Sequence, residues 1–240
     1  MMQQKTAIVT GASSGIGLGL TRTLLEQGYS VVANARTITI TGTLDASERL
    51  ALVDGDIARQ ETTTRIVETA IERFGRIDLL VNNAGIFIGK PFTEYTVEDF
   101  EQLVGTNLSG FFFLTQQAIH QMQEQQSGHI VNISAAIASQ PIAAIPSAVA
   151  ILTKGALNAA TKALALEYAH EGIRVNAIAP GTIDTPLSQK TDRAVLQRLQ
   201  PMPRIGSVAE IAAAVLYLTE APFITGEILH IDGGAHAGKW

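Results

Sequence analysis

The chain has 240 residues, which is enough to bury one large core and does not require a second domain. Hydrophobic residues make up 46% and charged residues 16%, and the net charge is -5 without a basic block, which argues against disorder and against nucleic-acid binding. The chain has no cysteine, and its five histidines show no close metal-ligand spacing, so we expect neither a disulfide nor a metal site.

Two apolar stretches bear on where the protein acts. Residues 6–10 follow Lys5 directly and lack the long apolar segment of a signal peptide. Residues 148–169 are interrupted by Lys154, Lys162 and Glu167, which argues against a membrane span. We therefore expect a cytoplasmic protein that acts on a small molecule, without a membrane or nucleic-acid partner.

Short runs rich in β-branched residues alternate with longer stretches of helical period along the chain. The expected strands are residues 6–10, 30–34, 50–53, 79–83, 129–134, 173–179 and 227–232. Strands that alternate with helices form a parallel sheet covered on both faces. The sequence therefore predicts an α/β fold with a doubly wound, seven-stranded parallel sheet in a single domain over residues 1–240.

Helix boundaries support this alternation. Thr96–Asp99 and Ser207–Glu210 have the spacing of capping boxes, and residues 37–47 read as a loop with at most one helical turn. Four glycines stand between a helical stretch and the next strand, as C-cap glycines do: Gly28, Gly75, Gly128 and Gly172.

A glycine-rich turn directly follows the first expected strand and precedes a helical stretch. Glycines in this place allow a tight turn, let backbone N–H groups approach a pyrophosphate, and put the anion at a helix N-terminus. The order of strand, turn and helix predicts a dinucleotide-binding turn. Its expected cofactor-binding residues are Gly11, Ser13, Ser14, Gly15, Ile16 and Gly17.

Further motifs follow the TGxxxGxG spacing of this turn in a fixed order. They are Asn82-Asn83-Ala84-Gly85, Asn107 in TNLSG, Lys154 on a helix, Pro180-Gly181 and Asp232-Gly233-Gly234. With them the chain resembles the short-chain dehydrogenase/reductase family over nearly its whole length. The resemblance implies a Rossmann domain and a nicotinamide cofactor. It also implies a homo-oligomer, either a dimer or a tetramer, in which helices around residues 104–121 and 147–169 pair across a dimer.

The end of the second expected strand bears on the choice of cofactor. An acidic residue there selects NAD, whereas an arginine accommodates the 2′-phosphate of NADP. This chain has Ala35 where family members that use NAD often carry Asp, and Arg36 follows it. We predict NADP(H); the alternative is that Arg36 is an ordinary solvated loop residue.

The resemblance also assigns other cofactor contacts. Asp56, with Ile57, matches the position that meets the adenine, although helix capping is an alternative for Asp56. Pro180 and Gly181 match the segment at the nicotinamide, although a structural turn is an alternative there. The remaining cofactor positions implied in this way are Asn83, Ala84, Gly85, Lys154, Ile183 and Thr185.

Two catalytic hydroxyl groups of the family are missing. Family members carry a Tyr four residues before the Lys and a Ser after the fifth strand, which together protonate and stabilise the oxygen that receives charge during hydride transfer. In this chain Ala150 and Ala135 stand at those positions. The loop between them is longer than the common family spacing, and no tyrosine lies nearby in the sequence: the four are Tyr29, Tyr95, Tyr168 and Tyr217.

The remaining candidates for catalysis are Asn107, Lys154 and Ser147. If a helix starts near Pro146, Ser147 shares a face with Lys154, but an N-cap role is the alternative for Ser147. Lys154 can still bind the nicotinamide ribose hydroxyls, and a surface lysine is its alternative. Asn107 can kink its helix or hold a water, and Thr153 is expected in packing or a dimer contact.

Two functions agree with these residues. One is an NADPH-dependent oxidoreductase whose acceptor needs little acid help, such as a quinone or another electron-poor carbonyl compound. The other is an NADP(H)-binding sensor or partner subunit with little or no turnover. Residues 187–205 lie where the family has a mobile substrate lid, and they do not identify the substrate.

Overall fold

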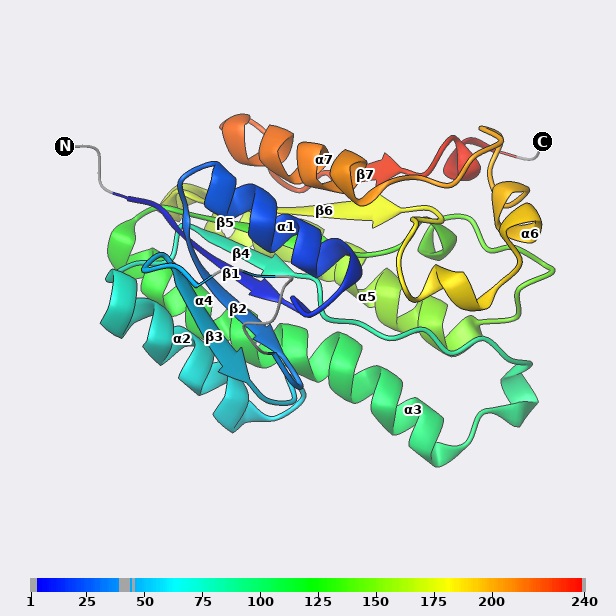
Figure 1. Ribbon diagram of the computed structural model, residues 1–240, viewed down its shortest axis with the longest axis horizontal. Helices are drawn as coiled ribbons and strands as arrows, with labels where there is room; N and C mark the ends of the chain where they lie inside the picture. The colour runs from blue at the N-terminus through cyan, green and yellow to red at the C-terminus, as the bar shows by residue number, and fades with distance from the viewer. Residues whose placement is uncertain (1–3, 39–43, 45, 239–240) are drawn as a thin grey trace.

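The computed structural model describes residues 4–38, 44 and 46–238, and its centre is one parallel sheet (Figure 1). The strand order is β3-β2-β1-β4-β5-β6-β7. The chain reverses its direction of winding between β1 and β4, so the predicted doubly wound, seven-stranded α/β fold is confirmed. The strands are β1 (Thr6–Thr10), β2 (Ser30–Ala35), β3 (Leu50–Asp54), β4 (Leu79–Asn82), β5 (Gly128–Ile133), β6 (Ile173–Pro180) and β7 (Ile228–Ile231).

Helices cover both faces of the sheet (Figure 1). One face carries α1 (Gly15–Glu26) and α7 (Val208–Glu220). The other face carries α2 (Gln60–Phe74), α4 (Gly110–Gln125) and α5 (Ala148–Tyr168). Two shorter helices, α3 (Val97–Val104) and α6 (Arg193–Gln197), lie toward the carboxyl ends of the strands. Short helical turns lie in the connections: η1 (Phe92–Glu94), η2 (Gly105–Ser109), η3 (Ala136–Ala138), η4 (Ala169–Glu171), η5 (Ser188–Lys190) and η6 (Ala235–Ala237).

Successive side chains of each strand point to opposite faces of the sheet, so the hydrophobic core is divided between the two helix layers. On β1, Ala7 and Val9 pack toward α1 and α7, whereas Ile8 packs toward α2 and α4. All five residues of β1 are buried, as expected for a central parallel strand covered on both faces. Burial of this kind fixes the register of the sheet and therefore the place of every residue at its carboxyl edge.

The predicted helix boundaries are mostly confirmed. Both capping boxes are present, and Gly75 ends α2 with a left-handed φ of +77°. The prediction for Gly128 is wrong: this glycine begins β5, and Gln126 takes the left-handed conformation at the end of α4. This conformation is unusual at a helix end for a residue other than Gly or Asn. The side chain of Gln126 is tied to the last turn of α4, because its Nε2 donates to Gln123 O. Of the predicted loop 37–47, residues 39–43 and 45 lie outside the described residues.

Helix α5 together with η4, Ala148–Glu171, is long and apolar enough to cross a membrane by length and composition. Long core helices pass the same test. This helix packs along β6, and its side chains at Leu157, Thr161 and Ala165 are buried. The expectation that no segment spans a membrane stays a prediction.

Candidate active site

The carboxyl ends of β1 and β4 are joined by hydrogen bonds at the switch point of the sheet. Asn83 Nδ2 donates to Thr10 O at 2.8 Å, and the backbone N–H groups of Asn83 and Ala84 donate to Thr10 Oγ1 at 3.0 and 2.9 Å. Ligands of doubly wound folds bind at this point, because the crossovers leave a crevice there. Thr10 therefore holds two predicted cofactor residues in place, a role that the sequence did not indicate.

The glycine-rich turn has the shape of a phosphate cradle. Gly11 and Gly15 have φ values of +66° and +53°, which favour glycine. A Cβ atom on Gly17 would lie 2.3 Å from Gly11 O and 2.5 Å from Asn83 Nδ2, so the first turn of α1 packs directly on the loop. Ser14 is the N-cap of α1 but makes no side-chain cap hydrogen bond, which leaves the first N–H groups of the helix to another acceptor.

Gly17→Ala is expected to loosen this packing and weaken dinucleotide binding. Because the added methyl overlaps backbone atoms, we expect a loss of about 1–3 kcal/mol in the free energy of unfolding. Gly155→Ala is the matched control, since nothing lies within 4 Å of a Cβ placed there in α5. Thermal unfolding and NADPH titration of both variants measure the effect; equal behaviour of the two would contradict it.

The predicted nicotinamide segment after β6 lies beside the phosphate cradle. The side chain of Thr185 is 3.2 Å from a Cβ placed on Gly15, so the two segments touch. Gly181 lies against Asp232, whose Cα would be 2.8 Å from a Cβ on the glycine. Ile183 is only 6% exposed and packs in the core beneath, where it forms a bridge with Gly206.

The residues expected at the adenosine end lie along β2 and β3. Arg36 directly follows β2 and is exposed. Asp56 Oδ1 accepts a hydrogen bond from Ala58 N at 3.0 Å, which is a local turn ahead of α2. Ile57 is buried against Gly110 of α4, and Ile16, in the first turn of α1, packs on the core.

Lys154 reaches from α5 to the end of β5. Its Nζ donates to Ile133 O at 2.8 Å, and Ser134 Oγ donates to the backbone oxygen of Lys154 at 3.1 Å. Burial lowers the pKa of Lys154 to about 8, because the ammonium loses water without gaining a carboxylate partner. A Cβ on Gly85 would lie 2.9 Å from this Nζ and 3.3 Å from Asn107 Oδ1. Gly85, Lys154 and Asn107 are therefore brought together.

Asn107 lies in the π-helical turn η2, so the expectation that it distorts its helix agrees with its place. Its Oδ1 accepts from Ile86 N at 2.9 Å, and its Nδ2 donates to Ile86 O at 3.1 Å and to Thr153 Oγ1 at 2.9 Å. Thr153 is fully buried within its own chain, so the alternative of a dimer contact for Thr153 is wrong. Both amide hydrogens of Asn107 are thus used in positioning neighbouring segments.

Ala150 is 1% exposed and packs in a small apolar cluster with Leu103 and Val149. Tyr95 packs against the same cluster, but its hydroxyl donates to Ile88 O at 2.6 Å. Within the described part of the chain, this cluster offers no unpaired hydroxyl beside Ala150. Ala135 follows β5 just before η3, where it contributes no polar side chain.

Ser147 does not take the place expected for a surrogate acid. Helix α5 begins at Ala148, one residue after Ser147, so Ser147 is the N-cap and not a first-turn residue. Its Oγ donates to Ile145 O at 2.9 Å instead of capping the helix. The hydroxyl is therefore turned back onto its own loop and away from the helix that carries Lys154.

Comparisons with known proteins agree with this geometry. The family model described as enoyl-(acyl carrier protein) reductase matches residues 11–236. The chain is 34% identical to 3beta-hydroxysteroid dehydrogenase 1 of Eggerthella lenta, over 97% of this chain and 94% of that protein. It is 37% identical to acetoacetyl-CoA reductase of an Acinetobacter species, over 98% of this chain and 99% of that protein.

Solved structures agree over the same length. ElxO with NADP bound has a TM-score of 0.91 at 31% identity and covers 98% of this chain and 100% of its own. The 3-ketoacyl-(acyl-carrier-protein) reductase of Brucella melitensis, complexed with NADH, has a TM-score of 0.90 at 31% identity with the same coverage. With a family model that matches most of its residues and relatives that align along its whole length, the chain belongs to the short-chain dehydrogenase/reductase family.

Proposed function

We propose that this chain is an NADP(H)-dependent oxidoreductase that reduces an electron-poor acceptor, such as a quinone, without a tyrosine acid. The observation that carries this proposal is the phosphate cradle at Gly11, Gly15 and Gly17, which packs against Asn83 and Thr185 without room for side chains. A bound NADPH would supply hydride there. The binding of NADP by ElxO, a relative of the same fold, supports the choice of cofactor.

The chain's own residues bind and orient both reactants in this proposal. The first-turn N–H groups of α1 receive the phosphates, and Lys154 turns from Ile133 O to the ribose hydroxyls of the cofactor. Asn107 holds Ile86 and Thr153, and so fixes the floor beneath Gly85. Positioning of two reactants can by itself supply much of a rate enhancement.

The acceptor follows from what replaces the family's hydroxyl groups. Ala150 and Ala135 provide no acid, and the hydroxyl of Ser147 is bound to Ile145 O. An ordinary ketone becomes an alkoxide that needs a proton as it forms. A quinone becomes a delocalised anion that takes its proton from water, so it suits a site without an acid.

Turnover tests this proposal directly. NADPH oxidation is followed by absorbance with simple ketones, diketones and quinones as acceptors. We expect oxidation with quinones and little with simple ketones. Tight NADPH binding with no oxidation by any acceptor would instead support the second candidate, a cofactor-binding sensor or partner subunit, which the burial of Ala150 in an apolar cluster also favours.

Arg36→Asp is expected to reverse the preference for NADPH over NADH. A charge-assisted hydrogen bond to the 2′-phosphate contributes about 1.5–3 kcal/mol, so NADPH affinity should fall roughly tenfold to a hundredfold. Lys162→Asp makes the same charge change at an exposed position of α5 and serves as the control. Titration with both dinucleotides measures the shift, and an unchanged NADPH/NADH ratio in Arg36→Asp would refute the assignment of Arg36.

We also propose that the protein is a cytoplasmic homo-oligomer, a dimer or tetramer. Apolar side chains stand exposed on the outer faces of α4 and α5, where Phe112 is 54%, Leu152 60% and Leu166 84% exposed. Exposed apolar groups on two neighbouring helices are typical of a subunit interface. Sedimentation analysis gives the number of subunits.

A further inference from the structure

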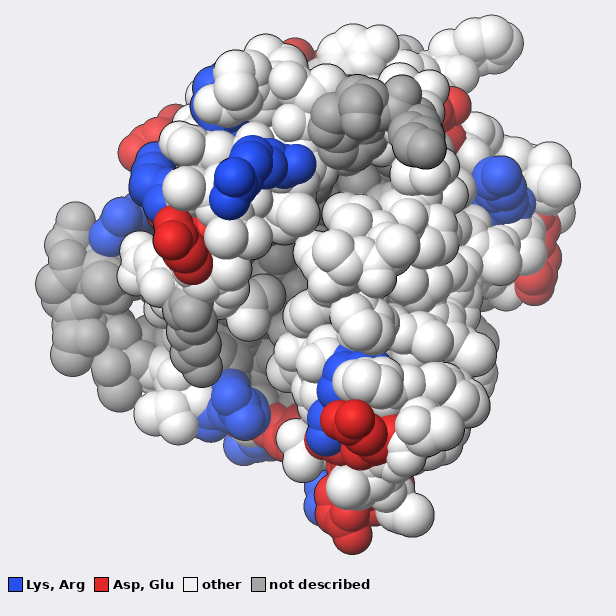
Figure 2. Space-filling view, turned by 90° about the vertical axis from the view of Figure 1, so that its right-hand side faces the viewer, with Lys and Arg blue, Asp and Glu red and all other residues white. Residues whose placement is uncertain are grey.

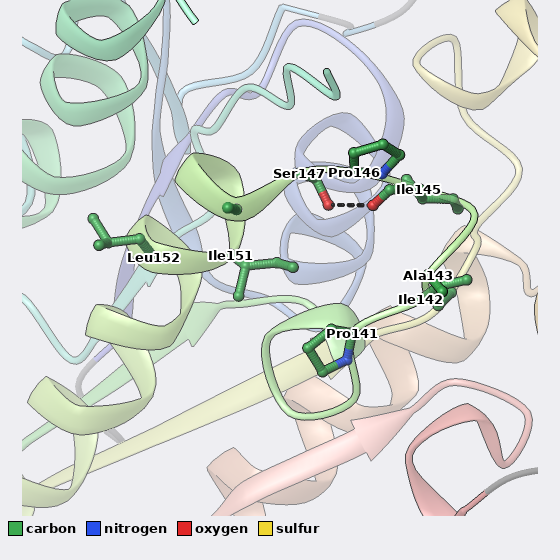
Figure 3. A pocket seen from close by; sticks show the side chains of 9 residues that line it. Pro141, Ile142, Ala143, Ile145, Pro146, Ser147, Ile151 and Leu152 are labelled. Atoms are coloured by element: carbon green, nitrogen blue, oxygen red, sulfur yellow. Dashed lines mark hydrogen bonds between the residues drawn. The ribbon is translucent and has the colours of Figure 1, made fainter. Parts of the chain in front are cut away.

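A serine and a histidine from distant parts of the chain meet near the C-terminal end. Ser139 directly follows η3, and His230 lies in β7. Ser139 Oγ is 3.0 Å from His230 Nε2, which is hydrogen-bond distance. In Figure 3 the loop that carries Pro141 lies beside the ribbon of β7. The hydride chemistry proposed above uses neither side chain of this pair.

The C-terminal turn η6 holds the His230 ring in place. This ring stacks on the His236 ring with 3.9 Å between the centroids and 18° between the planes. His236 Nδ1 donates to Asp232 Oδ2 at 2.8 Å, and the Asp232 side chain is only 2% exposed. The other oxygen of this carboxylate accepts from Gly234 N at 3.0 Å. The buried carboxylate therefore orients one imidazole ring, and that ring orients the other.

The surroundings of His230 keep its ring uncharged at neutral pH. Burial, and next the charge of His236, lower the pKa of His230 below 6.5, and Asp232, the Ile228 backbone and Glu227 oppose them only in part. An uncharged ring accepts a proton at Nε2 when its own hydrogen is on Nδ1. A hydrogen-bond partner in the Ile228 backbone favours that tautomer. The ring is thus in the state that a general base needs.

The hydroxyl of Ser139 is open to a reagent, unlike that of the other serine on this loop. Ser139 is exposed, whereas Ser147 is 3% exposed and its Oγ donates to Ile145 O (Figure 3). A backbone carbonyl is too weak a base to activate a hydroxyl, but an uncharged imidazole can do so. Acidic and basic side chains are scattered over the carboxyl edge of the sheet, which faces the reader in Figure 2. A surface of this kind does not select a charged reagent, so a neutral one suits it.

We propose that Ser139 is a nucleophile with His230 as its general base, and that the pair takes an acyl group from neutral activated esters. A nucleophile within hydrogen-bond reach of a base that a third group orients is the arrangement that this chemistry needs. His236, which orients the base, is a positioning residue. The pair works without the nicotinamide cofactor, so this inference does not rest on the proposed function.

The reaction has two steps. Ser139 Oγ attacks the carbonyl carbon of the ester, and its proton passes to His230 Nε2. The bond between that carbon and the ester oxygen then breaks, and the alcohol leaves with the proton from His230. Water removes the acyl group from Ser139 in the same way, which releases a carboxylic acid and restores the serine.

The experiment treats the complete protein with p-nitrophenyl acetate. Release of p-nitrophenolate is followed by absorbance, and acetylated residues are identified by mass spectrometry after an early acid quench. Ser127 is the internal control, because it is exposed and its hydroxyl has no hydrogen bond among the described residues. We expect Ser139 to be acetylated roughly a hundredfold faster than Ser127, since a general base contributes at least this factor. The proposal is overturned if Ser139→Ala releases p-nitrophenolate as fast as the wild type, or if both serines are acetylated at equal rates.

His230→Gln tests the base, because glutamine keeps a hydrogen-bond partner for Ser139 but takes up no proton. Acetylation of Ser139 should slow roughly a hundredfold in this variant and stay unchanged in His170→Gln, whose altered side chain is 75% exposed in the wild type. NADPH titration and thermal unfolding show whether each variant is folded. An unchanged rate at Ser139 in folded His230→Gln would refute the role of the base.

The pH profile of the wild type gives a readout that needs no variant. Acetylation of Ser139 should speed up as the pH rises through the lowered pKa of His230, and it should level off near neutral pH. A contact that only holds the loop would not produce this curve. A rate at Ser139 that climbs with pH without a plateau would mean that hydroxide, and not His230, removes the proton.

Discussion

Lys154→Met is expected to stabilise the protein without cofactor while it weakens NADPH binding. The lowering of the Lys154 pKa from 10.5 to about 8 means that the folded state holds this charge at a cost of about 3 kcal/mol at neutral pH. Methionine of similar length removes that cost but also the hydrogen bond to Ile133 O, so we expect a net gain of about 1–2 kcal/mol. NADPH affinity should fall at least tenfold, because a charged donor to the ribose is lost.

The pH dependence gives this prediction a second readout. The pKa of Lys154 is lower in the folded than in the unfolded state, so between about pH 8 and 10.5 the unfolded chain binds more protons and wild-type stability rises. The methionine variant should lack this contribution. Lys162→Met, at an exposed position of the same helix, should keep it. Urea unfolding across this pH range measures the contribution. If the free energy of unfolding changes with pH in the same way in the wild type and in Lys154→Met, the ammonium is not desolvated.

His129 is expected to make the fold sensitive to acid. Its ring is 3% exposed, with Nε2 3.1 Å from Asn176 Nδ2 and Nδ1 without a partner among the described residues. Burial, and next the charge of Arg174, hold the pKa of His129 well below 6.5. Below about pH 6.5 His129 is therefore protonated in the unfolded chain but stays neutral in the folded chain. The free energy of unfolding should fall by about 1.4 kcal/mol for each unit by which the pH is lowered.

His129→Gln tests this sensitivity, because its side-chain oxygen can still accept from Asn176 but does not titrate. We expect the variant to lose less stability than the wild type when the pH falls from about 7 to 5. His170→Gln is the control, since the side chain of His170 is 75% exposed. Equal acid sensitivity of all three proteins in urea unfolding would mean that other groups, such as the carboxylates, determine the slope.

The fold was largely predictable because its signals are local and repeated. Period-two burial, as at Ala7, Ile8 and Val9, marks each strand, and the capping box at Ser207–Glu210 marks a helix start without any knowledge of tertiary contacts. The prediction that Gly128 caps a helix was wrong because a glycine that begins a strand has the same sequence context as a C-cap glycine. Only the backbone conformation of Gln126 separates the two.

The candidate site was less predictable because its contacts join distant segments. Thr153 is an apolar-helix residue in sequence, yet it accepts from Asn107, 46 positions away. Ser139 and His230 are 91 positions apart, and no periodicity relates them. Ser147 could be placed near the helix start, but the direction of its hydroxyl depends on the backbone of Ile145.

The hydrogen bonds from Asn83 and Ala84 to Thr10 join two strand ends entirely within the chain. The backbone entropy of that crevice is therefore lost during folding and not during binding. Cofactor binding then needs no ordering of the backbone at this point, and only side chains such as Lys154 have to turn, so the rate of association should rise in proportion to cofactor concentration. In this way the threonine at the end of the first strand bears on how fast the site fills as well as on what fills it.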